Sequence, residues 1–579
     1  MGSAPQYSVP EEAQSIFQQG ILDNDLVPDL PSELRSLAKL VRFNGSSEPT
    51  LPINWRFAES ISALKAFEAS MLMILISRKY KTTPTEVTIN TDHATLFIMS
   101  PLVAKVIKDG EPRRIAFDVN GDEFLKKAFP STDKHRLGAT PHRSLTTNIY
   151  KTKDGRFYHV HGSLNPEPSL EALGLPADAP DTETYEQTLA NLQSAVSTFD
   201  SAALDELMNE KYRQAGTICY SSEEFFASAH GKANAHVALY ELPPTSESSG
   251  AHPPSWWPEN SSIPSSPKRP LAGLKIVDLT RIIAGPSITR GLAEMGASVM
   301  RITSPHVADF SVLHPDLNWG KWNGSLHLTN EEDKEKLRAL IRDADVVVDG
   351  YRPGVMEKHG FGRDAIFELV KERDRGIIHV RENCYGWHGP WSHRSGWQQI
   401  SDACTGVSMS YAKAMGNDEA VTPVFPNSDY CTGVCGSTAV LHALVRRAEF
   451  GGNQSVDVAL NYYSQWLIRS VGTYPPETWT KVHQRYKSPI YRHYHNMGYT
   501  LPAMLKLLSE YNANTLFDPA FFENRAAKNI ELTFVLPKPI AQFKDEDVKL
   551  GYNVGTRTNG VDVPRWPDDL NVEHVTDEN

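Results

Sequence analysis

The stretch LAGLKIVDLTRIIAGP, residues 271–286, decides the fold that the sequence predicts. Its first ten residues form an apolar run typical of a buried strand, and Gly285 with Pro286 is typical of a turn that opens a helix. A helical pattern continues to Met295, and residues 298–302 form the next apolar run. Strand, turn, helix and strand in this order predict a βαβ unit and therefore a parallel sheet.

The same alternation continues beyond this unit. Helical patterns cover residues 330–343 and 364–372, and apolar runs typical of buried strands cover residues 346–348 and 376–380. We therefore predict an α/β fold whose large domain is a Rossmann-like open parallel sheet, beside a smaller α+β domain. Ligands bind such sheets beyond the carboxyl ends of the strands, so the turn at residues 281–286 is a candidate binding site.

A second stretch, VFPNSDYCTG at residues 424–433, precedes a run of small and apolar residues, 434–444. The small residues predict a helix that lies close to another backbone, and Gly451 with Gly452 predicts its end. Asp429 then lies at or just before the helix N-terminus. These residues alone leave two roles open. Asp429 could cap the helix, or it could be a carboxylate that the helix N-terminus keeps ionised and able to attack an activated carbonyl.

Both stretches resemble the family III CoA-transferases, the CaiB/BaiF group that includes formyl-CoA transferase, carnitine CoA-transferase and α-methylacyl-CoA racemase. Residues 271–286 match the family's L-x-G-L-x-V-x-D/E opening with its A-G-P turn, and residues 296–302 match its G-A-x-V-x-x-I strand. The segment around Asp429 resembles the family's catalytic segment. The resemblance covers residues 271–470 with specific motifs and residues 55–240 more loosely.

The resemblance implies an acyl-CoA:carboxylate CoA-transferase. In that reaction Asp429 would attack the donor acyl-CoA, and the acyl group would be held briefly as an aspartyl acyl-anhydride. Coenzyme A and its thioesters are then substrates, and a carboxylic acid is the acceptor. No permanently bound cofactor and no metal site are expected.

The resemblance also implies which residues contact CoA. Ile282 and Ile283 correspond to the family's loop near the thioester, and Lys321 falls in a segment like N-x-x-K-x-S. Arg352 and Lys358 lie in a segment like the N-x-R-P-G-x(3)-R/K-x-G loop, where relatives place a basic residue on CoA phosphates. Charge-assisted contacts to phosphate suit these side chains, although a lone Lys or Arg is more often a solvated surface group.

A further motif separates the branches of the family. Trp397 and Gln398 stand where the family's racemases carry His and Asp. Moving a proton on both faces of an α-carbon requires two groups that titrate near neutral pH, and Trp and Gln do not. An acyl-CoA racemase or epimerase and a non-catalytic acyl-CoA binding protein remain the alternatives. Trp397 could stack on the adenine of CoA or belong to the core, and His388 is expected to be a bystander.

The chain divides into four predicted regions: an N-terminal half with a small-domain-like lobe (1–242), a Pro/Ser-rich linker (243–270), a CoA-binding catalytic domain (271–475) and a C-terminal extension (476–579). Within the lobe, Asp154-Gly155 predicts a hairpin turn rather than a catalytic acid. Trp256 and Trp257 are expected to hold the linker against a lobe.

An internal echo links the two halves. An amphipathic helix predicted from Trp55 to Arg78, a turn and the strand at residues 86–90 match the helix after Asp429, the glycine turn and the strand at residues 454–458. The match places Ser60 opposite Asp429. We therefore predict two related halves in one chain, and either a homodimer or an intramolecular pseudo-dimer.

Composition limits the other functions. The chain has 579 residues, 40% hydrophobic and 22% charged, with a formal net charge of -12, which argues against nucleic acid or an anionic membrane as the main partner. Residues 69–76 are the most apolar segment and are expected to form a core helix. Five cysteines, an odd and thinly spread set, indicate a reducing compartment, so we expect a cytoplasmic enzyme, with peroxisomal and mitochondrial locations left open. Cys431 and Cys435 are expected to be packing thiols.

Overall fold

The computed structural model describes residues 7–27, 30–115, 122–180, 182–244 and 252–578. Its large sheet has six parallel strands: β8 (Lys275–Leu279), β9 (Ser298–Thr303), β10 (Lys321–Ser325), β11 (Val346–Asp349), β12 (Ile378–Asn383) and β13 (Gln454–Ala459). They lie in the order β10-β9-β8-β11-β12-β13. This is the strand order of a doubly wound Rossmann sheet, and it reverses between β8 and β11. The predicted fold class is confirmed.

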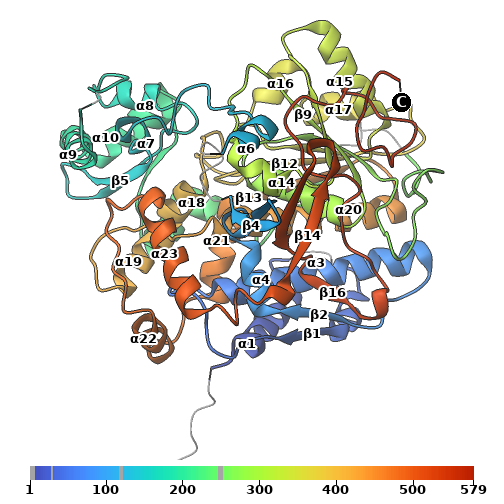
Figure 1. Cartoon of the computed structure of the whole chain (residues 1–579), viewed down its shortest axis with the longest axis horizontal. Coiled ribbons are helices and arrows are strands. Elements are labelled where there is room, and N and C mark those ends of the chain that lie inside the picture. The colour runs from blue at the N-terminus through green and yellow to red at the C-terminus, as the bar shows by residue number, and fades with distance from the viewer. Residues whose placement is uncertain (1–6, 28–29, 116–121, 181, 245–251, 579) are drawn as a thin grey trace, which may run out of the picture.

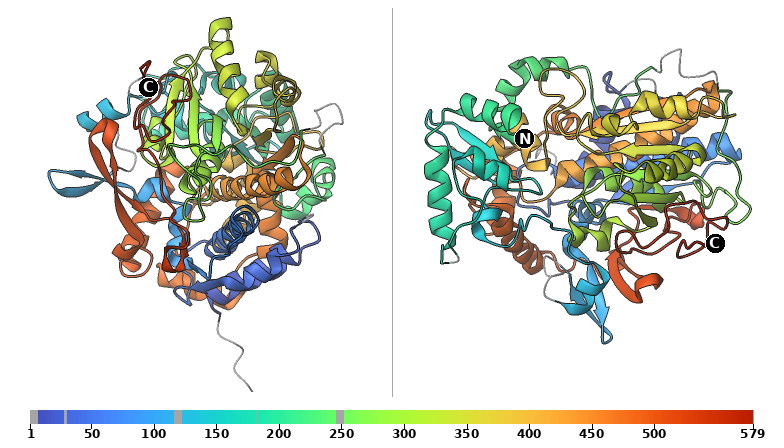
Figure 2. Two further views of the ribbon diagram at one scale, coloured as in Figure 1. Left: turned by 90° about the vertical axis from the view of Figure 1, so that its right-hand side faces the viewer. Right: turned by 90° about the horizontal axis from the view of Figure 1, so that it is seen from above.

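Helices cover both faces of this sheet (Figure 2). On β8, the alternating side chains of Ile276 and Val277 are both fully buried, but in different cores. Ile276 shares its core with α13 (Ala284–Glu294) and α20 (Asn427–Phe450), whereas Val277 shares its core with α15 (Glu331–Asp343) and α17 (Arg363–Leu369). A strand that is buried on both faces needs an almost continuous apolar run, which is why β8 could be recognised in the sequence.

Strand β10 was not among the predicted strands. Its sequence, KWNGS, contains a lysine, an asparagine and a glycine, so it lacks the apolar run by which β8, β9, β11 and β12 were found, and it has no part in the echo by which β13 was found. It nevertheless pairs with β9 along its whole length. Its pairing with a central strand buries Lys321, and this decides the role of that side chain below.

Two 24-residue helices, α3 (Phe57–Tyr80) and α20, lie side by side beneath the sheet (Figure 2). Helix α3 is buried on every side from Phe57 to Ile76, so the sequence correctly predicted a helix here but wrongly predicted an amphipathic one. Among the described residues, α3 alone has the length and hydropathy of a membrane-spanning helix, and 94% of its apolar window is buried inside the protein.

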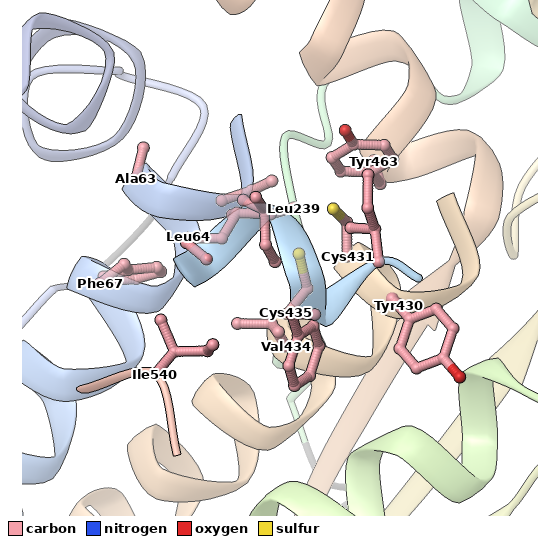
Figure 3. Close-up of a cluster of buried hydrophobic side chains, with 14 of the residues drawn as sticks. Ala63, Leu64, Phe67, Leu239, Tyr430, Cys431, Val434, Cys435, Tyr463 and Ile540 are labelled. Atoms are coloured by element: carbon pink, nitrogen blue, oxygen red, sulfur yellow. The ribbon is translucent and has the colours of Figure 1, made fainter. Parts of the chain in front are cut away.

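The contact between these helices is a dense apolar cluster. Leu64 and Phe67 of α3 lie in one buried cluster with Val434 and Cys435 of α20 (Figure 3). All five cysteines are buried and unbridged, and burial raises the pKa of the Cys431 thiol to about 12. This placement agrees with packing thiols.

Each of the two long helices belongs to a βαβ unit. Strand β1 (Val41–Asn44) pairs in parallel with β2 (Val87–Asn90) across α3, and β12 pairs in parallel with β13 across α20. The internal echo in the sequence therefore has a counterpart in the fold, and it supports two related halves. Ser60, the position that matches Asp429, is fully buried, and its hydroxyl lies 2.9 Å from the hydroxyl of Tyr463.

The smaller lobe is built on an antiparallel sheet of β5 (Asn148–Lys151), β6 (Phe157–Val160) and β7 (Gly216–Ile218), with α7 (Pro141–Ser144), α8 (Glu167–Ala172), α9 (Tyr185–Val196) and α10 (Ser201–Glu206). Figure 1 shows this lobe at one side of the large sheet. Gly155 has φ +80°, as the hairpin turn requires. The carboxylate of Asp154 accepts hydrogen bonds from Thr152 and Ser201, so it stabilises the turn.

Strands near the C-terminus pair with strands of the N-terminal half. Strands β14 (Phe522–Ala527) and β15 (Leu532–Pro537) form an antiparallel sheet with β3 (Lys105–Lys108) and β4 (Glu111–Arg114), and β16 (Ala541–Phe543) pairs with β2. In the linker, residues 245–251 lie outside the described residues. Trp257 is buried there, and its indole N–H donates to the carbonyl of Ala272 at 2.9 Å. The four domain limits stay a prediction.

Candidate active site

Asp429 is the third residue of α20, and its side chain lies where two pockets meet. The residue is partly exposed, unlike its buried neighbours Ser428 and Tyr430. Pro426 occupies the cap position of the helix, and no side chain caps the helix there. The carboxyl group of Asp429 therefore does not cap the helix, and it faces the two pockets.

The first pocket, of about 90 Å³, is the more polar of the two, and it lies where the strand order reverses. Its walls are the turn after β8 (281–284), the loop after β11 (350–353), the end of β12 (382–384), the segment 394–397, and Asp429 with Leu460. This is where a doubly wound sheet binds its ligand. The candidate site of the sequence analysis and Asp429 thus line one pocket.

Two arginines give this pocket a positive edge. Among the described residues, neither Arg281 nor Arg352 forms an ion pair with an acid. Arg352 donates to the carbonyl of Arg213 at 3.2 Å, and burial together with the charges of Arg281 and Arg213 lowers its pKa. Arg394 also lines the pocket, but its charge is already paired with Asp205 and Glu210. Arg281 and Arg352 are therefore suited to attract an anionic ligand.

The turn between β8 and α13 is strained. Ile282 has φ +73°, a left-handed conformation that is costly for a β-branched residue. Ile282 and Ile283 line both pockets, and no side chain caps the N-terminus of α13. Its first backbone N–H groups can therefore face an anion or a carbonyl oxygen. Strain of this kind persists where the surrounding structure requires it, often at functional sites.

Glycine holds the two helix N-termini close together. A Cβ on Gly433 of α20 would lie 2.5 Å from the Cβ and Oγ of Ser287 on α13, and a Cβ on Gly436 would lie 2.5 Å from Ile288. The small residues after Asp429 therefore do what the sequence predicted, since they let α20 lie against another backbone. The consequence is local to the site, because Ser287 is four residues beyond Ile283.

The carboxyl groups of Asp402 and Glu382 interact electrostatically with that of Asp429. Burial, followed by the charge of Asp402, raises the pKa of Asp429 well above its usual value. Burial raises the pKa of Asp402 to about 8, and burial together with Asp429 and Asp349 raises that of Glu382 to about 8. The pKa of Asp429 is thus raised although the helix N-terminus favours its ionised form. Burial and neighbouring acids outweigh a helix field of about 1 kcal/mol.

The second pocket is a larger cavity of about 620 Å³ that also has Asp429 in its wall. Trp397 lies between the two pockets, where its indole N–H donates to Ser163 Oγ at 3.1 Å and its ring stacks on His161, with centroids 5.3 Å apart. Gln398 lines the cavity and donates to the carboxylate of Asp402. These contacts come from the small lobe and from α18 (Gln398–Thr405), so the cavity lies where separate parts of the chain meet.

Comparison with known proteins then identifies the family. The model of CoA-transferase family III matches residues 271–495. An acetyl-coenzyme A transferase of Hypoxylon pulicicidum, nodX, is 58% identical over 100% of this chain and 97% of its own length. The chain belongs to CoA-transferase family III. An acyl-CoA transferase of Gibberella moniliformis is 32% identical over 78% of this chain and 77% of its own length. An acetyl-CoA:oxalate CoA-transferase of Acetobacter aceti is 31% identical over 34% of this chain and 53% of its own length.

As a family III CoA-transferase, the chain is an enzyme that acts on CoA thioesters, as the sequence predicted. The structure brings together six of the eight predicted site residues in the walls of the two pockets at Asp429: Asp429, Ile282, Ile283, Trp397, Gln398 and Arg352. Gln398 lines the larger cavity as a partner of Asp402. Which of them contact CoA stays a prediction.

Lys321 does not fit its predicted role. Its side chain is wholly buried, and its ammonium group donates to Asp278 at 3.0 Å and to the carbonyl of Pro286 at 2.9 Å. A lysine in this position cannot reach a CoA phosphate. The missed strand β10 explains the error, because the pairing of β10 with β9 carries Lys321 under α13. Its two hydrogen bonds there connect β8, through Asp278, with the first turn of α13, through Pro286.

Lys358 is exposed on α16 (Val355–His359) and lines neither pocket at Asp429. Its neighbours Val355 and His359 line a third pocket, of about 170 Å³, together with His306 and the ring of Tyr351. Tyr351 also lines the polar pocket, so the two cavities share a wall. Lys358 therefore lies beside the third pocket and not at Asp429.

Sequence reasoning missed three residues of the site. Arg281 is the first residue of the candidate turn at residues 281–286, and its charge could have been noted. Glu382 lies two residues beyond the predicted strand at residues 376–380 and within the observed strand β12, at the ligand-binding edge of the sheet, which is a usable signal. His161 gave no signal, because it reaches Trp397 from more than 200 positions earlier in the chain.

One group of side chains has the composition of a metal site. Among the described residues, only His236, Glu241 and His388 bring three candidate ligand atoms within 4.8 Å of one another. Hydrogen bonding also accounts for the group, since His388 lies 2.7 Å from one oxygen of Glu241 and Tyr462 donates to the other at 2.6 Å. The group lines neither pocket at Asp429, and the expectation of no metal site stays a prediction.

Proposed function

We propose that this chain transfers CoA between an acyl-CoA and a carboxylic acid through an acyl-anhydride on Asp429. One observation carries the proposal. Asp429 lies where an arginine-edged polar pocket and a large cavity meet, beside the open N-terminus of α13. A transferase needs these features, because an anionic CoA must approach from one side while an acyl group is accommodated on the other.

The polar side is suited to CoA. Arg281 and Arg352 have no acidic partner among the described residues, and Tyr351 connects their pocket to the third cavity near His306 and Lys358. A phosphate group pairs well with guanidinium and ammonium groups. In this arrangement the nucleotide end of CoA would lie in the third cavity, and its pantetheine arm would run past Tyr351 to Asp429.

The chemistry follows from the carboxylate. In the first step, an Oδ atom of Asp429 attacks the thioester carbonyl, a C–O bond forms, the C–S bond breaks, and CoA leaves as the thiolate. The acceptor carboxylate then attacks the Asp429 carbonyl and releases the donor acid. The thiolate finally attacks the acceptor's carbonyl, which forms the new thioester and returns Asp429 as a carboxylate. Each step exchanges one acyl bond for another of similar reactivity, so the sequence is reversible.

The surrounding groups support this path. Negative charge develops on the carbonyl oxygen during each attack, and backbone N–H groups at the N-terminus of α13 can stabilise it. Asp429 must be ionised to attack, and its raised pKa makes the ionised form a stronger base and nucleophile. The alternative of a racemase has less support, because His161 is the side chain beside Trp397 and its Nδ1 already accepts from the backbone N–H of Ser163 at 2.9 Å.

The decisive experiment replaces Asp429 by asparagine. We expect Asp429→Asn to lower the rate of CoA transfer by at least about 1000-fold, because removal of a covalent nucleophile has effects of this size or larger. Thermal stability should stay close to that of the wild type. Glu449→Gln makes the same chemical change at the exposed far end of the same helix, where Glu449 pairs with Arg78, and should keep full turnover.

A trapping measurement tests the intermediate itself. Wild-type protein incubated with acetyl-CoA, the donor suggested by the name of the Hypoxylon relative, and then with hydroxylamine should carry a hydroxamate on the peptide that contains Asp429. Mass spectrometry of that peptide reads the result. Full turnover in Asp429→Asn, or a trapped acyl group on another residue, would refute the proposal. A cytoplasmic location remains a separate prediction.

A further inference from the structure

The larger cavity beside Asp429 differs in chemistry from the polar pocket. Its walls come from three separate parts of the chain: Leu164 and Tyr185 in the small lobe, Ile283 and Leu313 in the large domain, and Met497 and Leu501 in α23 (Met497–Tyr511). Its volume of about 620 Å³ falls in the range of sites that hold drug-sized molecules. A two-carbon acyl group would leave most of this space unfilled.

The cavity also lacks positive charge. Among its described lining residues, Asp429 is the only acidic side chain, and none is a lysine or an arginine. Two histidines, His159 and His161, line it, and burial lowers the pKa of His159 to about 4 and that of His161 well below its usual value. The hydrogen bond from the Ser163 backbone to Nδ1 of His161 also fits a neutral ring. A second carboxylate in this cavity would have no cation to pair with.

The mouth of the cavity is apolar as well. Five large hydrophobic side chains are exposed among the described residues, and two of them, Phe310 and Tyr499, line this cavity. Tyr499 is 51% exposed and stacks on His495, with ring centroids 4.1 Å apart. Exposed apolar groups that gather at the rim of a cavity mark a surface that receives an apolar ligand.

We propose that this cavity receives the body of a bulky, apolar monocarboxylic acid, either as the free acid or as its CoA thioester, with the carboxyl carbon at Asp429. This inference rests on the proposed function and names its substrate class. Small diacids, such as the oxalate in the name of the Acetobacter relative, fit poorly, because their second carboxylate would be buried without a partner.

The test compares acids of matched length. With acetyl-CoA as donor, we expect kcat/KM to rise from propanoate through hexanoate to decanoate, by up to about fourfold for each methylene that becomes buried. Decanedioate has the same chain as decanoate with a second terminal carboxylate, and its kcat/KM should be at least about 100-fold lower. Oxalate and malate should be poor acceptors. Equal use of decanoate and decanedioate, or a preference for oxalate or malate, would overturn the inference.

A substitution can reverse this preference. Leu164→Arg places a cation in the cavity wall and should raise the ratio of decanedioate to decanoate turnover by at least about tenfold. Leu164→Met keeps the volume and should retain the wild-type ratio. If Leu164→Arg instead raises the KM for acetyl-CoA and leaves the acid ratio unchanged, the cavity holds part of CoA and the inference fails. Should the arginine variant not fold, the wild-type comparison of the two acids still decides.

Hydroxylamine trapping with acetyl-CoA alone separates this inference from the proposed function. Trapping needs the anhydride on Asp429 but no acceptor acid. Absence of a hydroxamate on Asp429 in the wild type would refute the proposed function, and this inference with it. Trapping without the predicted preference among acids would refute only the substrate class.

Discussion

The carboxyl group of Asp429 has neighbours that make its ionisation costly. Burial and Asp402 raise its pKa well above the usual value of about 4, and only the ionised form can attack a thioester. The rate of CoA transfer should therefore rise with pH along a limb that lies above the range of an ordinary aspartate. A pH profile of kcat/KM measures this limb for the free enzyme.

Asp402→Asn tests the cause of that limb. Removing the neighbouring charge should move the ascending limb to lower pH, while the hydrogen bond from Gln398 can still be accepted by the asparagine oxygen. Asp374→Asn changes an exposed aspartate, whose side chain is 89% accessible, and should leave the profile in place. An unchanged limb in Asp402→Asn would show that Asp402 does not set the pKa of Asp429.

The raised pKa of Asp402 also makes the stability of the protein depend on pH. Burial raises the pKa of Asp402 to about 8, so the folded protein binds this proton more tightly than the unfolded chain does. The stabilisation is complete below about pH 4 and is lost as the pH rises through 8. Asp402→Asn should therefore lose less thermal stability than the wild type between pH 6 and pH 9. Melting curves at both pH values, with Asp374→Asn as the control, measure the difference.

Ile282 and Ile283 give a matched pair for the strained turn. Glycine adopts a φ of +73° without strain, so Ile282→Gly should cost little stability or raise it, since such strain amounts to about 1–3 kcal/mol. Ile283 has φ -118°, where glycine offers no relief, so Ile283→Gly should lower stability by about 0.5–1 kcal/mol. Turnover in Ile282→Gly should fall at least tenfold, because a relaxed turn no longer fixes the N-terminus of α13 beside Asp429. If Ile282→Gly is stable and keeps full turnover, the strain at Ile282 is not needed for activity.

At the scale of elements, the site depends on how closely α13 and α20 pack. A Cβ on Gly433 would lie 2.5 Å from Ser287, so Gly433→Ala must push the two helices apart. Overpacking of this kind costs about 1–3 kcal/mol, and the displaced turn should lower CoA transfer as well. Ser287→Gly removes the side chain with which the new methyl group would clash. In the double variant, stability and turnover should recover part of the loss, which a double-mutant cycle measures as a coupling energy. Additive losses would mean that this contact does not position the site.

The strands that could be predicted from the sequence are mostly those that contain a run of apolar residues, because such a strand is buried on both faces of the sheet. Strands β8, β9, β11 and β12 contain apolar runs and β13 was found through the internal echo, whereas β10 is buried without an apolar run and was missed. That omission led to the wrong role for Lys321. Asp429 and the turn at Ile282 were found through motifs, but the positive φ of Ile282 was not, because no sequence pattern marks an isoleucine in a left-handed conformation. The contact of His161 with Trp397 depends on tertiary packing and had no local signal.

At the scale of the whole molecule, one chain provides every wall of the site. His161 comes from the N-terminal half, Asp429 from the large domain and Met497 from α23, and all three line the cavity. The two βαβ units also cover each other, since α3 packs on α20 and both are buried. Segments that are far apart in the chain thus meet at one site. We therefore favour the intramolecular pseudo-dimer over the homodimer.

The pseudo-dimer predicts a single chain with a single site. Light scattering after size-exclusion chromatography should give about the mass of one chain, 64.5 kDa, and hydroxylamine trapping should give one hydroxamate per chain. The N-terminal half should not supply a second nucleophile, because Ser60 is fully buried against Tyr463 and lines neither pocket at Asp429. Ser60→Asp should therefore not restore turnover to Asp429→Asn, even where the double variant folds. A mass of two chains, or recovered turnover in that variant, would show instead that the first half retains a working site.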